Sequence, residues 1–117
     1  MATEADVRRI ALALPETTED TWYGTPGFKV TGKGFLRLRT DAEGALVIFV
    51  SHLGEQQALI AGNSEAFFIT PHYANYPAVL VNLEAVAVDE LTELITESWR
   101  LKAPKRVLKT FDEAANG

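Results

Sequence analysis

Residues 28–50 read FKVTGKGFLRLRTDAEGALVIFV, and this stretch is the most informative about the fold that the chain is expected to adopt. Apolar and polar residues alternate over 28–30 and 35–39, as in strands with one buried face, whereas 45–50 is continuously apolar, as in a central strand. The two segments between these runs are rich in glycine and polar residues and predict tight turns. Strands joined by short turns pair antiparallel, so we expect a three-stranded meander.

The length of the first turn predicts which side chains share a face of this meander. With a three-residue turn at 32–34, the expected cross-strand pairs are Val30 with Leu36, Lys29 with Arg37, and Phe28 with Leu38. The next hairpin then sets Leu36 and Leu38 beside Ile48 and Leu46. One face becomes wholly apolar, and the other presents Lys29, Arg37 and Arg39 among Phe35, Val47 and Phe49. Interleaved basic and aromatic residues are typical of nucleic-acid platforms; the alternatives are a face covered by helices or a dimer interface.

Outside the meander, apolar periodicity and capping residues predict the other elements. We expect helices from Thr3 to Leu14, over 53–61, from Asp89 as N-cap to about Leu101, and after Pro104, with strands at 66–69 and 78–83 and turns over 16–27. The fold class is therefore α+β, with two layers, a mainly antiparallel five-stranded sheet, helices on one side, and the order α-β(3)-α-β(2)-α-α. Without a repeat or a linker, residues 1–117 are expected to form a single domain.

The composition is that of a globular chain, with 117 residues, 47% hydrophobic and 23% charged residues and a net charge of −5. Disulfide and thiolate chemistry is excluded because there is no cysteine. No apolar run approaches the ~18 residues that span a bilayer, and the acidic N-terminus lacks the apolar core of a signal peptide. We therefore expect a cytoplasmic protein without a membrane partner.

The net charge conceals two basic stretches that contain no acidic residue. Residues 21–40 hold four of the eleven basic side chains and residues 99–111 hold five, so the rest of the chain is strongly acidic. The candidate nucleic-acid or anion-binding residues drawn from these stretches are Lys29, Lys33, Arg37, Arg39, Arg106 and Lys109. A solvated basic helix face and a covered sheet face are the structural alternatives.

No catalytic motif is present, and we expect neither catalytic residues, nor a metal site, nor a cofactor. His52 and His72 are twenty residues apart and lack metal-ligand spacing. The polar aromatic residues Trp22, His72, Tyr73 and Tyr76 are candidates either for binding a ligand or for anchoring their loops.

Three spaced blocks resemble the signatures of the MmcQ/YjbR-like family. They are Trp22-Tyr23-Gly24-x-Pro26-x-Phe28-Lys29-Val30-x-Gly32-Lys33-x-Phe35, Thr70-Pro71-His72-Tyr73 and Ser98-Trp99-Arg100-Leu101. The resemblance implies an α-β(3)-α-β(2)-α fold in two layers, akin to type III secretion chaperones, and members are commonly described as DNA-binding proteins with a double-wing arrangement. It also implies that the residues most important for function are Lys29, Lys33, His72 and Tyr73. Ala78 stands where many members have a tryptophan, so a ligand pocket built on that ring does not carry over.

Two functions are expected from these features. The first is a small non-enzymatic protein that binds DNA weakly and in a salt-dependent manner, as the family resemblance implies. The alternative is a chaperone-like or adaptor module that binds another protein, or a second copy of itself, through its sheet face or edge, with no nucleic acid involved.

Overall fold

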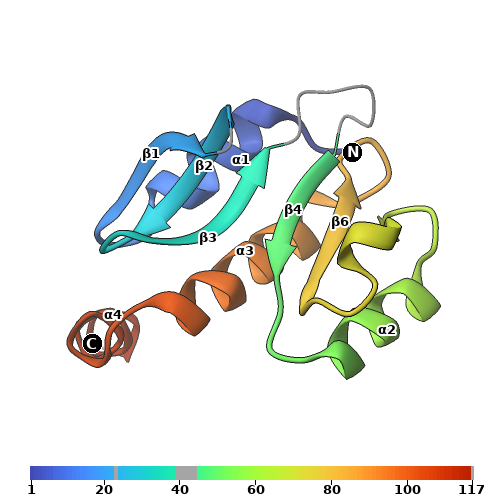
Figure 1. The fold of residues 1–117 in the computed structure, drawn as a ribbon. Coiled ribbons are helices and arrows are strands. Elements are labelled where there is room, and N and C mark those ends of the chain that lie inside the picture. Colours follow the sequence, from blue (N-terminus) through green and yellow to red (C-terminus); the bar gives the residue numbers. More distant parts are fainter. Residues whose placement is uncertain (23, 39–44, 117) are drawn as a thin grey trace.

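The computed structural model of the protein describes residues 1–22, 24–38 and 45–116 (Figure 1). A helix precedes four strands, and a second helix separates these strands from the last two, which are joined by a short 3-10 turn and followed by two helices. The bounds are α1 (Glu4–Leu12), β1 (Thr17–Trp22), β2 (Thr25–Val30), β3 (Lys33–Leu38), β4 (Ala45–Phe49), α2 (Leu53–Gly62), β5 (Phe67–Phe68), η1 (Pro71–Tyr73), β6 (Ala78–Asn82), α3 (Val88–Lys102) and α4 (Lys105–Asn116).

The strands of the described residues form one six-stranded sheet in the order β1-β2-β3-β4-β6-β5, with every neighbouring pair antiparallel. The predicted α+β class and antiparallel sheet are confirmed, but the count of five strands is wrong. The additional strand is β1, which lies in the segment expected to be turns. It is a polar edge strand whose residues 18–21 are all exposed, so no apolar alternation marks it in the sequence.

The helices begin and end close to the predicted positions. Thr3 and Asp6 form the capping box at the start of α1. The predicted N-cap of α3 is wrong, because Ala87 holds that position and Asp89 lies inside the first turn, where a negative charge still complements the helix dipole. In α4, Val107 is buried against the main core, as its apolar spacing predicts.

The register is as predicted between β3 and β4, where Leu36 faces Ile48 and Leu38 faces Leu46. Between β2 and β3 the predicted register is wrong, because Phe28 faces Leu36 and Lys29 faces Gly34. One residue of β3, Phe35, is left without a partner, which is a β-bulge. A bulge turns two successive side chains toward the same face, so Phe35 and Leu36 both enter the core.

The main core lies between one face of the sheet and the helices, with α3 running beneath the sheet in Figure 1. This confirms the prediction of helices on one side. The other face carries a smaller cluster made of Ala45, Val47, Tyr73, Ala78 and Leu80, which the loop around η1 closes. The expectation that Phe35 and Val47 face outward is wrong, since Phe35 is fully buried in the main core and Val47 packs in the smaller cluster. None of the helices in the described part of the chain has the length and apolarity needed to cross a membrane.

Candidate functional site

Arg37 joins two of the candidate residue sets. It lies on β3 between Gly27 and Val47 of the neighbouring strands. Its Nη2 donates to the hydroxyl of Tyr73 at 2.8 Å, and its Nη1 donates to Oγ1 of Thr25 at 3.4 Å. The guanidinium therefore ties the β2–β3 hairpin to the loop around η1, which follows it by 36 positions in the chain.

The loop around η1 is held from the other side by Gln56, a residue of α2 that is absent from the sequence-based candidates. Gln56 is buried, and its side-chain nitrogen donates to the carbonyl oxygens of Tyr73, Tyr76 and Ala78 at 3.0, 2.9 and 2.7 Å. A single glutamine in a short helix has no sequence signal that separates it from a solvent-exposed one. Tyr73 is consequently fixed by its packing in the smaller cluster, by the hydrogen bond from Arg37 to its hydroxyl and by the one from Gln56 to its carbonyl. These contacts are those of a residue that anchors its loop.

His72 and Tyr76 are more exposed than Tyr73. The ring of His72 meets that of Tyr73 edge-on at 4.8 Å, and Tyr76 is half exposed beside Phe49, with ring centroids 5.8 Å apart. Trp22 ends β1. Arg39 lies outside the described residues.

Lys29 is not the direct cross-strand partner of Arg37, so the predicted pairing of these two like charges is wrong. It faces Thr18 on β1 and Gly34 on β3, and its Nζ lies 3.8 Å from a carboxylate oxygen of Asp20. The edge strand β1, which the sequence does not predict, thus supplies the carboxylate that pairs with this lysine.

The two basic stretches meet at Glu16. The main-chain carbonyl of Glu16 accepts the N–H of Thr31 in the β2–β3 turn at 3.3 Å, and its carboxylate binds both terminal nitrogens of Arg106 at 2.7 and 3.0 Å. These hydrogen bonds hold the pKa of the Glu16 carboxyl below its usual value and raise the pKa of Arg106. Glu16 therefore bridges the β2–β3 turn and the start of α4, and both elements lie at the left of Figure 1.

Exposed cations lie on the two elements that Glu16 joins. Lys33 is the first residue of β3, directly after the β2–β3 turn. On α4, the side opposite the buried Val107 carries Lys105, Arg106 and Lys109. Arg106 keeps 67% of its side-chain surface exposed despite its ion pair. Among the described residues, none forms an ion pair with Lys33, Lys105 or Lys109. We name the set Lys33, Lys105, Arg106 and Lys109 the basic corner.

The third sequence block has a structural role in joining elements. The hydroxyl of Ser98 donates to the carbonyl of Phe35 at 2.8 Å, and the indole N–H of Trp99 donates to that of Pro15 at 3.1 Å. Arg100 pairs with Asp112 of α4 at 2.7 Å. These contacts fix α3 to the sheet, to the end of α1 and to α4.

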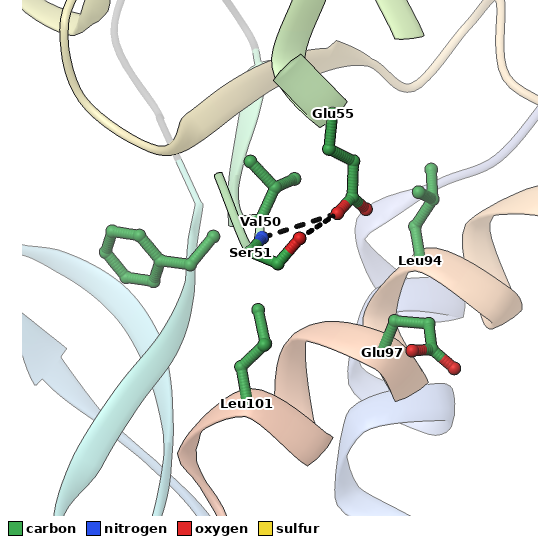
Figure 2. A pocket seen from close by; sticks show the side chains of 7 residues that line it. Val50, Ser51, Glu55, Leu94, Glu97 and Leu101 are labelled. Atoms are coloured by element: carbon green, nitrogen blue, oxygen red, sulfur yellow. Dashed lines mark hydrogen bonds between the residues drawn. The ribbon is translucent and has the colours of Figure 1, made fainter. Parts of the chain in front are cut away.

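Two further features concern ligands. In the part of the chain that the structure describes, no group of three or more metal-ligating side chains occurs. A small pocket of about 70 Å³ lies between the end of β4, the start of α2 and α3. Figure 2 shows Glu55 and Ser51 on one side of it, joined by hydrogen bonds, and Leu94, Glu97 and Leu101 of α3 on the other.

Comparison with known proteins identifies the relatives of this chain. A family model described as YjbR matches residues 12–101, from the end of α1 to the end of α3. Uncharacterised proteins of Mycobacterium tuberculosis and Mycobacterium bovis are 38% identical to it over 124 residues, which cover 95% of this chain and 96% of each relative.

A solved structure shares the fold. The crystal structure of a Deinococcus radiodurans protein with a DUF419 domain matches with a TM-score of 0.72 at 23% identity, covering 86% of this chain and 78% of that one. The resemblance inferred from the three sequence blocks is thereby confirmed, and the chain belongs to the YjbR family.

Proposed function

We propose that this protein is a non-enzymatic nucleic-acid-binding protein that contacts the phosphate backbone through its basic corner. The observation that carries the proposal is the junction at Glu16, which sets the basic face of α4 beside the β2–β3 turn. Cations from two distant stretches then share one surface. Clustered basic side chains on a helix face and a neighbouring turn are the electrostatic footprint expected for contacts to a phosphate backbone.

The strength of this binding is limited by the remaining charge of the molecule. The net charge is −5, so there is no domain-wide attraction for a polyanion. Four cations in contact with duplex phosphates correspond to a slope of log K against log salt of about −3.6, since each contributes about −0.9. We therefore expect weak binding that is detectable at low salt and lost at physiological ionic strength.

The alternative of protein binding through the sheet face has lost most of its support. For the sheet face, that hypothesis rested on Phe35, Val47 and Phe49 facing outward; the likeness to secretion chaperones and the sheet edge were its other grounds. Phe35 is in the main core, Val47 lies in the cluster closed by Tyr73, and Phe49 is partly buried. Members of the family that this chain resembles are commonly described as DNA-binding, and this description supports the nucleic-acid proposal instead.

The first test is the salt dependence of binding to a labelled random-sequence duplex, followed by fluorescence anisotropy between about 25 and 200 mM salt. Lys109→Gln should weaken binding and make the slope shallower by about 0.9, because one phosphate contact is lost. The control is Gln57→Glu on exposed α2, which changes the net charge equally but lies across the molecule from α4 (Figure 1). Binding that is absent at low salt, or equally weakened by both variants, would refute the proposal.

The second test is a gain of affinity. The carboxylate of Glu16 competes with phosphate for Arg106, whereas its main-chain carbonyl makes the link to the β2–β3 turn. Glu16→Gln should therefore free Arg106 without detaching the turn, and bind the duplex more tightly than the wild-type protein at the same salt. An affinity lower than wild type would show that the basic corner is not the contact surface.

A further inference from the structure

A second surface of the molecule combines exposed apolar side chains with acidic ones and with Lys102, whose Nζ lies 5.2 Å from the centre of the Phe49 ring. Among the described residues, Tyr76 and Leu101 are exposed by 50% and 46%, and each lies beside the partly buried Phe49. The ring of Tyr76 contacts that of Phe49, and Leu101 lines the pocket of Figure 2 together with Phe49 and Leu94. We name Phe49, Tyr76, Leu94 and Leu101 the Phe49 patch. Exposed apolar surface that continues into a pocket is typical of an interaction site.

The size of the pocket indicates what it holds. Its volume of about 70 Å³ is far below the roughly 300–1,000 Å³ of small-molecule and cofactor sites. The pocket is therefore suited to an anchor residue from a protein surface rather than to a metabolite.

The charged residues at the rim of the pocket indicate which residues should flank the anchor on the partner. Glu55 of α2 and Glu97 of α3 line the pocket from two sides. Oε2 of Glu55 accepts from the hydroxyl of Ser51 at 2.5 Å, which holds the carboxylate in place at the rim. A partner that places an aliphatic side chain here gains most if a basic residue stands next to it.

The chain itself carries such an element at the end of α1. Leu12 is 47% exposed, and Arg8 and Arg9 precede it by four and three positions, so all three side chains share one side of the helix. Arg8 and Arg9 are paired with Glu19 and Asp6 in exposed ion pairs. Exposed pairs exchange partners at little cost.

We infer that the protein associates with a second copy of itself by placing Leu12 of one copy in the pocket of the other, with Arg8 and Arg9 facing Glu55 and Glu97. The contact is small and partly electrostatic. The association is therefore weak, reversible and favoured by low salt. It uses a surface that does not include the basic corner, so nucleic-acid binding and self-association are separate properties.

Sedimentation velocity over a range of protein concentrations, without nucleic acid, tests this inference. The weight-average mass of the wild-type protein should rise with concentration. Leu101→Ser, in the pocket, and Leu12→Ser, at the anchor, should each raise the dissociation constant by at least about tenfold. Ala13→Ser is the matched control, because Ala13 is exposed next to Leu12 and changes none of the proposed contacts.

Charge reversal then tests the pairing itself. Arg9→Glu and Glu97→Arg should each weaken association, and combining the two in one chain should restore part of it. A wild-type protein that stays monomeric at all concentrations would overturn the inference. So would a loss of association in Leu101→Ser but not in Leu12→Ser, since the pocket would then hold something other than α1. All serine variants keep the net charge, so duplex binding should be unchanged in them, whichever way the association experiment ends.

Discussion

Gln56 illustrates how much one buried polar side chain can determine. Its amide has two N–H groups and serves three main-chain carbonyls of the loop around η1. That loop closes the smaller apolar cluster and presents the hydroxyl of Tyr73 to Arg37. Within the described residues, no buried side-chain nitrogen or oxygen lacks a hydrogen-bond partner. Any replacement of Gln56 that cannot donate breaks this arrangement.

Gln56→Leu keeps the side-chain size but removes the donor that three carbonyls share. Those of Tyr73 and Tyr76 still accept the main-chain N–H groups of Tyr76 and Ala78, so the carbonyl of Ala78 is the one that depends on Gln56. An unsatisfied buried polar group costs about 1–3 kcal/mol, so the free energy of unfolding should fall by about that amount. Urea unfolding followed by circular dichroism measures this. Gln57→Leu, at the exposed neighbouring position, should change it by less than about 0.5 kcal/mol. Equal midpoints for the two variants would contradict the role assigned to Gln56.

Single elements are governed by their ends, and α2 shows this clearly. His52 is its N-cap, and its Nδ1 accepts the N–H of Glu55 at 3.1 Å. The imidazole lies over Gly54, where a Cβ atom would be only 2.9 Å from Nδ1. Gly54 therefore stands in the first turn of a helix because the histidine cap needs the space, and not because the backbone needs a glycine conformation.

This relation between cap and glycine predicts a coupling between two substitutions. Alanine in place of a helical glycine usually gains about 0.5–1 kcal/mol, and losing an N-cap costs about 1 kcal/mol. Gly54→Ala should therefore leave wild-type stability nearly unchanged, because the gain is offset by a displaced cap. In the background of His52→Ala, the same change should stabilise by about 0.5–1 kcal/mol. Thermal or urea unfolding of the four proteins measures the cycle, and an identical gain in both backgrounds would contradict it.

At the scale of the whole molecule, the C-terminal helices are bonded to the segment that connects α1 with β1. Trp99 donates to the carbonyl of Pro15, and Arg106 binds the carboxylate of the next residue, Glu16, which is 90 positions away in the chain. The ring of Phe111 packs against Trp99 with centroids 4.9 Å apart. The placement of α4, and hence of the basic corner, depends mainly on the packing of Phe111 on Trp99 and on the burial of Val107, since the pair of Arg106 with Glu16 is exposed.

The ion pair of Glu16 and Arg106 predicts a pH dependence. Because Arg106 lowers the pKa of Glu16 in the folded state, the folded protein holds this proton less strongly than the unfolded chain. The stability from the pair is fully present above the ordinary glutamate value of about 4.3 and is lost as pH falls through the lowered pKa. The pair is exposed, so added salt should reduce the effect.

NMR titration of the side-chain carboxyls measures this prediction. In Arg106→Gln, the pKa of Glu16 should rise toward its ordinary value, and the fall in stability with acid should become less steep. Asp6, whose pKa is lowered by hydrogen bonds from Thr3 and Arg9, serves as the internal control and should not change. A Glu16 titration that is the same in wild type and variant would show that the pair does not form in solution.

Features that depend on local periodicity follow from the amino-acid sequence alone. The apolar spacing of α1, α3 and α4, the capping box at Thr3 and the strands β2, β3, β4 and β6 are all evident there, because burial of one face imposes a period that neighbouring residues reveal. The three sequence blocks likewise indicate the family, which the match to the YjbR model confirms. The polar edge strand β1 was missed because it carries no such period.

The meeting of distant residues, in contrast, depends on the tertiary fold. The bulge at Phe35 shifts the register and places the side chain of Phe35, predicted to lie on the surface, in the core. No local sequence pattern indicates this bulge. The partners of Arg37 and Arg106 lie 36 and 90 positions away, so they depend on how whole elements pack. Periodicity specifies which face of an element is buried, but the charge environment of each cation is set by the elements that the fold places beside it. For this reason the cations of the two basic stretches have different environments. Some form the basic corner, and others form intramolecular ion pairs or hydrogen bonds.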